Sequence, residues 1–151
     1  MANPTPVFSV REAATSDAPR IASLADELGY RVDTEETKHR LASLPAAHIV
    51  LVADIPEGVV GWLHAFHGQS MLHGDRVEIV GLAVAADHQG QGVGTALIAH
   101  LEQWTHQLGV QVIRVLSGSE RIAAHRFYDK CGYRRLKTEQ VFTKSVDPEG
   151  P

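Results

Sequence analysis

Residues 89–94, which read QGQGVG, are the part of this sequence with the clearest chemical capacity. They hold three glycines within five residues, so the backbone can turn tightly and approach a ligand with no Cβ atom in the way. The apolar run 79–84 precedes them, and a helical pattern begins almost at once after them. The start of a helix offers unpaired N–H groups and the positive end of its dipole. The segment therefore predicts a site for an anion such as a phosphate, held without Lys or Arg.

Two common phosphate-binding motifs can be compared with this segment. A dinucleotide fold needs Gly-x-Gly-x-x-Gly and an acidic residue about twenty positions later. Counted from Gly90, the third glycine position is Thr95, and residues 110–116 contain no acidic side chain. A P-loop needs a lysine before its Ser or Thr, whereas Gly94 directly precedes Thr95. The spacing weakens the first motif and excludes the second.

The nine histidines and the single cysteine do not predict a metal site or a nucleophile. His64 and His67 would point to opposite faces of a strand, and His100 and His106 would not share a helix face. Cys131 could act as a nucleophile only with a base nearby. We therefore expect no metal, scattered surface histidines and a cysteine that serves packing.

Length and composition predict one globular domain. The chain has 151 residues, of which 44% are hydrophobic and 21% charged, so we expect a single domain over 1–146 and a short disordered tail over 147–151. The net charge of −4 argues against general attraction to nucleic acid or to acidic membranes. The lone cysteine, the polar start and the lack of a long apolar run predict a cytoplasmic protein.

Periodic patterns predict the elements before the glycine segment. Asp17 is expected to cap a first helix and Thr34 a second, and Gly81 suggests a β-bulge or a place where another backbone comes close. The expected strands are 7–11, 49–53, 59–66 and 76–84, with a polar loop over 68–75.

The elements after the glycine segment follow the same alternation. A helix is expected from Val93 to Leu108, ended by Gly109, and a second from Glu120 to Cys131, capped by Ser119. The expected strands are 110–116, 133–136 and 140–144.

The glycine segment closely resembles the signature of the GNAT superfamily of acyl-CoA-dependent N-acetyltransferases: Gln or Arg, two residues, Gly, one residue, then Gly or Ala. The resemblance extends upstream through residues 78–84, EIVGLAV, and downstream to residues 121–133, RIAAHRFYDKCGY, which look like the family's second motif. The expected order of elements is also the family's. The resemblance implies an α/β fold of the α+β type, with a mixed, mostly antiparallel sheet of about seven strands and about four helices, splayed between strands 4 and 5.

By this resemblance, the bound anion would be the pyrophosphate of acetyl-CoA. Backbone N–H groups of residues 91–95 would hold it, and residues 82–84 would bond the pantetheine arm like an added strand. Fixed backbone donors need little side-chain ordering, and one near Val84 could stabilise the oxyanion of the reaction. His125 would contact the pantetheine or a phosphate, with a solvent-facing histidine as the alternative. The expected cofactor-contacting residues are Leu82, Ala83, Val84, Gln89, Gly90, Gln91, Gly92, Val93, Gly94, Thr95, His125 and Tyr128.

The resemblance further implies direct transfer of acetyl to an amine, with Tyr128 and Glu78 as candidate catalytic residues. Tyr128 would act as general acid, since a phenol with a pKa near 10 lies within about two units of a thiol; a core tyrosine is the alternative. Glu78 would accept the proton of the amine through water; an exposed strand residue is the alternative. Glu78 should share a face with Leu82 unless a bulge at Gly81 shifts the register.

The acceptor is the least defined partner. By resemblance, residues 30–36 and 137–139 would shape its site. Asp33, Glu35 and Glu36 favour a cationic amine, although the same carboxylates also fit the start of an exposed helix. We expect an N-acetyltransferase that acts on a primary amine of a small molecule or peptide, in a homodimer by family habit. The rival is a non-catalytic acyl-CoA-binding module, and a nucleotide oxidoreductase is a distant third.

Overall fold

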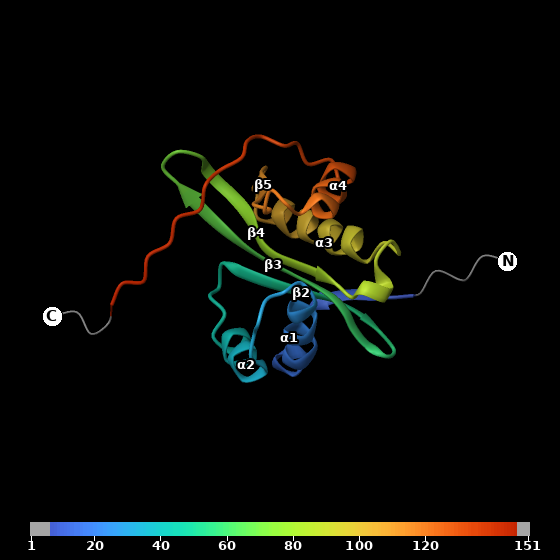
Figure 1. Cartoon of the computed structure of the whole chain (residues 1–151). Helices are drawn as coiled ribbons and strands as arrows, with labels where there is room; N and C mark the ends of the chain where they lie inside the picture. The colour runs from blue at the N-terminus through green and yellow to red at the C-terminus, as the bar shows by residue number, and fades with distance from the viewer. Residues whose placement is uncertain (1–6, 148–151) are drawn as a thin grey trace. The chain divides into compact units, whose positions relative to one another are not determined.

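The chain forms two compact units, Met1–Leu116 and Ser117–Pro151, and the computed structural model describes residues 7–147 of it. The first unit contains a five-stranded sheet and three helices, and the second contains one helix (Figure 1). The elements of the first unit are β1 (Ser9–Glu12), η1 (Thr15–Asp17), α1 (Ala18–Glu27), α2 (Thr34–Ala42), β2 (His48–Ile55), β3 (Gly58–Ser70), β4 (Gly74–Val84), η2 (Ala86–His88), α3 (Val93–Gln107) and β5 (Ile113–Val115). The second unit carries α4 (Ile122–Lys130).

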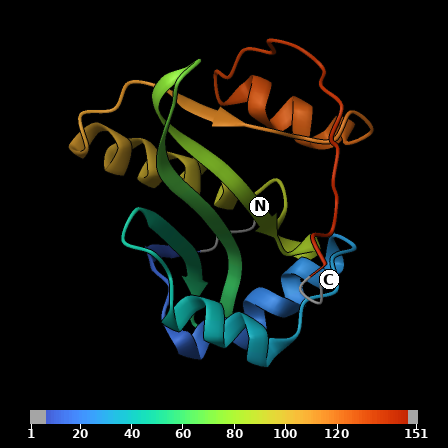
Figure 2. The same cartoon turned by 90° about the vertical axis from the view of Figure 1, so that its left-hand side faces the viewer.

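The sheet is mixed and mostly antiparallel, as expected. Its strands follow chain order. Each of β1, β2 and β3 pairs antiparallel with the next strand, and β5 runs parallel to β4. Helices α1 and α2 lie on one face and α3 lies on the other (Figures 1 and 2). On the first face, α1 packs against β3 and β4, and α2 packs beside α1.

Two expectations about strands are wrong. Residues 133–136 and 140–144 form no strand, so the sheet has five strands rather than seven. Val141 and Phe142 in this stretch are 85% and 90% exposed; strand propensity gains its energy from neighbouring strands, which these residues lack. Residues 68–75 are not a polar loop, because β3 and β4 stay paired as far as Ser70 and Gly74. Residues 148–151 of the expected tail lie outside the described residues.

The helix starts also differ from the expected caps. Asp33, not Thr34, caps α2 by accepting a hydrogen bond from the Glu36 N–H at 3.1 Å. Helix α4 has Arg121 at its N-cap position in place of Ser119. Asp17 does precede α1, but its carboxylate makes no cap hydrogen bond. In contrast, the end of α3 at Gly109, with φ of 75°, is as expected.

Helix α3 approaches the sheet closely at Gly61 on β3. A Cβ on this buried glycine would lie 2.9 Å from Val93 Cγ1 and 3.4 Å from Leu97 Cδ1. Gly61 therefore faces α3, and because side chains alternate along a strand, Leu63 and Ala65 face it too. The intervening side chains of β3 face α1.

A bulge in β4 decides where Glu78 points. The register with β3 shifts between His64 and Ala65, so that Val80 has no partner of its own. Leu82 stands opposite Leu63, on the α3 face, whereas Glu78 stands opposite Phe66, on the α1 face. Glu78 and Leu82 thus lie on opposite faces, and the bulge suggested by Gly81 is confirmed.

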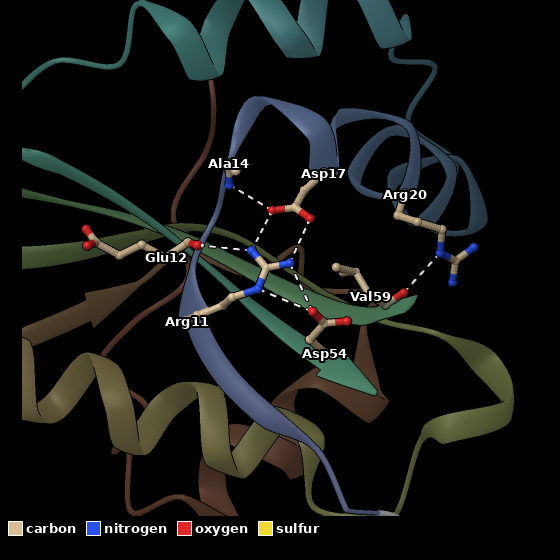
Figure 3. Close-up of polar contacts among 7 residues, drawn as sticks. All are labelled: Arg11, Glu12, Ala14, Asp17, Arg20, Asp54 and Val59. Atoms are coloured by element: carbon tan, nitrogen blue, oxygen red, sulfur yellow. Dashed lines mark hydrogen bonds and ion pairs between the residues drawn. The ribbon is translucent and has the colours of Figure 1, made fainter. Parts of the chain in front are cut away.

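An ion-pair network fastens β1 to the start of α1 and to β2 (Figure 3). Arg11 donates from Nη1 and Nη2 to the two oxygens of Asp17 at 2.8 and 2.9 Å, and from Nη2 to Asp54 at 3.0 Å. The buried Asp17 carboxylate also accepts the Ala14 N–H at 2.7 Å. The hydrogen bond from Arg11 lowers the pKa of Asp17. The carboxylate therefore stabilises this end of the first unit in its charged form.

Within residues 7–147, the helices are too short or too polar to cross a bilayer.

We expect Asp17→Asn to lower the free energy of unfolding by about 1–3 kcal/mol at pH 7, because the buried carboxylate that accepts from Arg11 and Ala14 is replaced by an amide with one oxygen acceptor and no charge. Asp26→Asn, on the exposed side of α1, should change it little. Since the pKa of Asp17 is lowered by folding, the advantage of the wild type should be complete above about pH 4 and vanish as the pH falls further. Urea unfolding at a series of pH values measures both effects, and equal stability of the two variants at pH 7 would refute the role of Asp17.

Candidate active site

The glycine segment forms an open, left-handed turn between β4 and α3. Gly90 and Gly92 have φ values of 76° and 88°, a region that favours glycine. Nothing lies within 4 Å of the position that a Cβ would take at either residue. The space in front of the turn is therefore free for a ligand to approach the backbone.

Helix α3 begins without a side-chain cap. Its N-cap residue is Gly92, and the first helical hydrogen bond runs from the Ala96 N–H to the Gly92 carbonyl at 3.0 Å. The N–H groups before Ala96 have no acceptor within the helix. They can donate hydrogen bonds to an anion at the positive end of the helix dipole.

The two glutamines of the segment brace this turn. The Gln89 side-chain amide donates to the Val84 carbonyl at 3.3 Å, and that of Gln91 donates to the Asp87 carbonyl at 3.4 Å. These contacts tie the turn to the last residue of β4 and to η2. The glutamine side chains thus support the backbone, which leaves the N–H groups to contact the ligand.

The end of β4 has a strand partner on one side only. Leu82, Ala83 and Val84 pair with β3, whereas β5 pairs with β4 only from Val77 to Ile79. Among the described residues, no strand continues beside Leu82–Val84 on the β5 side. Sheet and glycine turn therefore present a free backbone edge next to a helix start whose first N–H groups have no side-chain cap.

Glu78 lies near the start of the β4–β5 pairing, on the α1 face of the sheet. Its side chain and that of Arg76 are each 14% exposed, and Arg76 Nε lies 3.7 Å from Glu78 Oε1. The Nε and Nη1 atoms of Arg76 are buried without a hydrogen-bond partner. The positive charge of Arg76 therefore offsets the negative charge of Glu78, although the two groups are too far apart for a hydrogen bond.

Tyr128 and His125 belong to the second unit, on α4. The Tyr128 ring makes edge contacts with Phe127 and Tyr133, with ring centroids 5.2 and 5.7 Å apart. Burial raises the pKa of Tyr128 to about 12, so the phenol is a weaker acid than the sequence suggested. The His125 ring lies 2.9 Å, at Nε2, from the Gly118 carbonyl.

An open pocket of about 380 Å³ lies at the start of α2. Three carboxylates and two basic side chains line it: Asp33, Glu35, Glu36, His39 and Arg40. Arg40 approaches Glu36 at 3.7 Å, and Asp33 caps the helix. The acidic cluster therefore fits both explanations: Asp33 caps the helix, and Asp33, Glu35 and Glu36 line a pocket that a ligand could enter.

The sequence patterns did not predict a pair of neighbouring histidines on the α1 face of the sheet. His48 Nδ1 of β2 lies 2.9 Å from His64 Nε2 of β3. Only the strand register brings them together, and that register includes a shift between Ala53 and Asp54 that a plain hairpin alignment of β2 and β3 would not predict. Elsewhere in residues 7–147, no group of three or more His, Cys, Asp or Glu side chains is arranged to hold a metal ion.

Comparison with known proteins gives a consistent result. The family model described as "Acetyltransferase (GNAT) family" matches residues 12–133. The chain is 29% identical to an aminoalkylphosphonate N-acetyltransferase of Salmonella typhimurium, over 93% of each chain. It is 26% identical to an aminoglycoside N(6′)-acetyltransferase of Stenotrophomonas maltophilia, over 93% of this chain and 95% of the relative. The crystal structure of an aminoglycoside 6′-N-acetyltransferase from Acinetobacter baumannii shares the fold, with a TM-score of 0.80 at 15% identity, over 93% of this chain and all of the other.

Proposed function

Because this chain belongs to the GNAT acetyltransferase family, we propose that it transfers the acetyl group of acetyl-CoA to a primary amine of a small cationic molecule. It is an acyl-CoA-dependent N-acetyltransferase. The observation that carries the choice of donor is the open glycine turn at an uncapped helix start, next to a free strand edge.

The donor would bind to the backbone of the first unit. The pyrophosphate would accept hydrogen bonds from N–H groups at the start of α3, between Gln91 and Thr95. The pantetheine amides would pair with the free edge of Leu82–Val84 as an added strand would. Backbone donors are fixed by the fold before the ligand arrives, so little ordering of side chains is needed.

The reaction would be a direct attack of the amine on the thioester carbonyl. A backbone N–H near Val84 would stabilise the oxyanion that forms, because it is aimed in advance at that charge. When the C–S bond breaks, Tyr128 would donate a hydrogen bond or its proton to the departing thiolate. A phenol with a pKa of about 12 stays protonated at neutral pH and is available as a donor.

The proton balance also needs an acceptor, because the amine arrives as an ammonium ion. Glu78 lies on the α1 face, half-buried beside Arg76. Its carboxylate would attract the ammonium group and take its proton through water.

The acceptor would approach from the acidic start of α2. Asp33, Glu35 and Glu36 line the open pocket there, and carboxylates favour a cation by charge complementarity. The relatives include an aminoglycoside acetyltransferase, whose name identifies a polycationic substrate class. We therefore rank aminoglycosides and polyamines above amino acids and peptide N-termini as acceptors for this chain.

An acceptor screen tests this proposal. Release of free thiol from acetyl-CoA should be fastest with kanamycin or spermidine and slower with 2-aminoethylphosphonate, amino acids and peptides. A thermal shift with CoA and no turnover on any amine would indicate the non-catalytic binding module instead. A preference for the phosphonate would reject a cationic acceptor but not the acetyltransferase activity.

We expect Gly92→Ala to weaken CoA binding at least about tenfold, since the substitution strains a left-handed residue by about 1–2 kcal/mol and places a methyl group before the helix start. Gly109→Ala is the matched control: it carries the same type of strain, at φ of 75°, at the opposite end of α3. Titration calorimetry with CoA measures the difference. Equal affinities of the two variants would show that the turn does not contact the donor.

We expect Tyr128→Phe to lower kcat at least about tenfold, because the thiolate loses its proton donor. The affinity for CoA should change little, since the aromatic ring stays. Steady-state kinetics and calorimetry test the two statements separately, and a loss in kcat below about twofold would remove Tyr128 from the mechanism.

A further inference from the structure

Phe66 is an aromatic neighbour of Glu78 that the reaction described above does not use. On the α1 face of the sheet, Phe66 of β3 pairs with His48 of β2 on one side and with Glu78 of β4 on the other. Side chains that stand directly opposite each other on neighbouring strands have Cβ atoms about 5 Å apart. The aromatic ring and the carboxylate are therefore immediate neighbours on this face.

The contacts of Phe66 fix how its ring lies. The His48 ring stacks on it, with centroids 5.2 Å apart and an angle of 23° between the planes. Along β3, the Phe66 Cε2 atom lies 2.8 Å from the position that a Cβ would take at Gly68, so the ring rests against this glycine. The stack occupies the ring face toward β2. The other face is turned toward Glu78 on β4, and no further ring of the described residues stacks on it.

Helix α1 lies over the start of β3 on this face. Arg20 of α1 donates to the Val59 carbonyl at 2.9 Å, and Val60 is only 4% exposed. Farther along the same face of β3, Trp62 and Phe66 are only half-buried. The cover thus ends before Phe66, and the region around its ring is partly open to a ligand.

The part of the face between Trp62 and Phe66 offers rings rather than charge. The Trp62 ring lies over Gly81, with its Cζ3 atom 2.7 Å from the position that a Cβ would take there. His64 stands between the two aromatic residues and forms a hydrogen bond of 2.9 Å with His48. Burial, and then the proximity of His48, lower the pKa of His64 to about 4. The His64 ring is therefore neutral at physiological pH.

The charges next to Phe66 offset one another. Arg76 Nε lies 3.7 Å from Glu78 Oε1, and each side chain is 14% exposed. Arg114 of β5 also stands opposite Glu78. Beyond the one ammonium group that Glu78 can pair with, further cationic groups therefore gain little on this face. A hydroxyl group differs, because it can donate to the carboxylate and accept from the guanidinium.

We propose that the ring face of Phe66 toward β4 is the platform for the sugar ring of an amino sugar, which makes the acceptor a cyclic, hydroxyl-bearing amine rather than a linear polyamine. The C–H groups of a saturated ring form an apolar surface that packs on the aromatic face. The hydroxyl groups accept from Arg76 and donate to Glu78, and the amine lies beside the carboxylate. The inference rests on the proposed function and narrows its acceptor class from aminoglycosides and polyamines to aminoglycosides.

The test compares Phe66→Leu with Phe66→Tyr, which keeps the ring. Phe8→Leu, just before β1 and likewise half-buried, is the matched control. In Phe66→Leu, KM for kanamycin should rise at least about fivefold with little change in kcat, because the packing of the sugar ring is lost. KM for spermidine should change less than about twofold. Phe66→Tyr and the control should resemble the wild type.

Three results would overturn the inference. They are an unchanged KM for kanamycin in Phe66→Leu, an equal rise for the two acceptors, and a Phe66→Tyr variant as weak as Phe66→Leu. If Phe66→Leu does not fold, judged by circular dichroism, Phe66→Met takes its place.

Arg76→Met changes the preference between the two acceptors. Without the guanidinium, the charge of Glu78 is unopposed, so spermidine should be a better substrate, whereas kanamycin loses a hydrogen-bond donor. The ratio of kcat/KM for kanamycin to kcat/KM for spermidine should therefore fall at least about tenfold. An unchanged ratio would contradict the role of the ion pair in selecting hydroxyl groups. Arg76→Leu replaces Arg76→Met if the latter does not fold.

A further measurement does not depend on turnover. With CoA in place of acetyl-CoA, NMR spectra of kanamycin should show upfield ring-current shifts of its C–H protons with the wild type and with Phe66→Tyr, but not with Phe66→Leu. If these shifts appear and acetyl-CoA acetylates no amine, the proposed function fails while the platform stands. If kanamycin is acetylated without these shifts, the platform is refuted and the proposed function stands.

Discussion

The close approach of α3 to β3 at Gly61 is the contact on which the arrangement of the first unit depends. With no Cβ at this position, Val93 and Leu97 reach the sheet, and the start of α3 is held over the middle strand. That start carries the glycine turn, which Gln89 ties to the carbonyl of Val84. This packing helps to place the uncapped N–H groups at the start of α3 beside the free edge of β4. A side chain at residue 61 would have to displace Val93, whose Cγ1 would lie 2.9 Å from the new Cβ.

The two faces of the sheet carry different side chains of β4. The bulge at Val80 places Leu82 on the α3 face and Glu78 on the α1 face. In a regular strand, residues four apart would share a face, so the extra residue is what allows them to differ. The face with Glu78 is therefore separated from the face with Leu82, which lies at the free edge of β4.

The sequence was sufficient for features that depend on neighbouring residues. The glycine turn, α3 with its end at Gly109, and the long strand before the turn all follow from local spacing. The histidine pair does not. The register between β2 and β3 shifts between Ala53 and Asp54, and without that shift His48 would stand opposite Ala65, on the other face from His64. Likewise, Asp17 has the position of a cap, but its carboxylate accepts hydrogen bonds from Arg11, six residues before it, which helical spacing does not predict. The two expected strands over 133–136 and 140–144 show the converse, since their residues have the pattern of strands but form none in the structure.

The Arg11 network has a consequence for the order in which the chain assembles. Arg11 meets Asp17 six residues away and Asp54 forty-three residues away. The entropy lost on closing a loop grows with its length, so the short clamp to Asp17 is the easier of the two to close. It can hold the turn before α1 while the chain is still being synthesised and β2 has yet to emerge. The guanidinium is then already oriented when Asp54 arrives, and the N-terminal strand needs only to dock, not to find its own geometry.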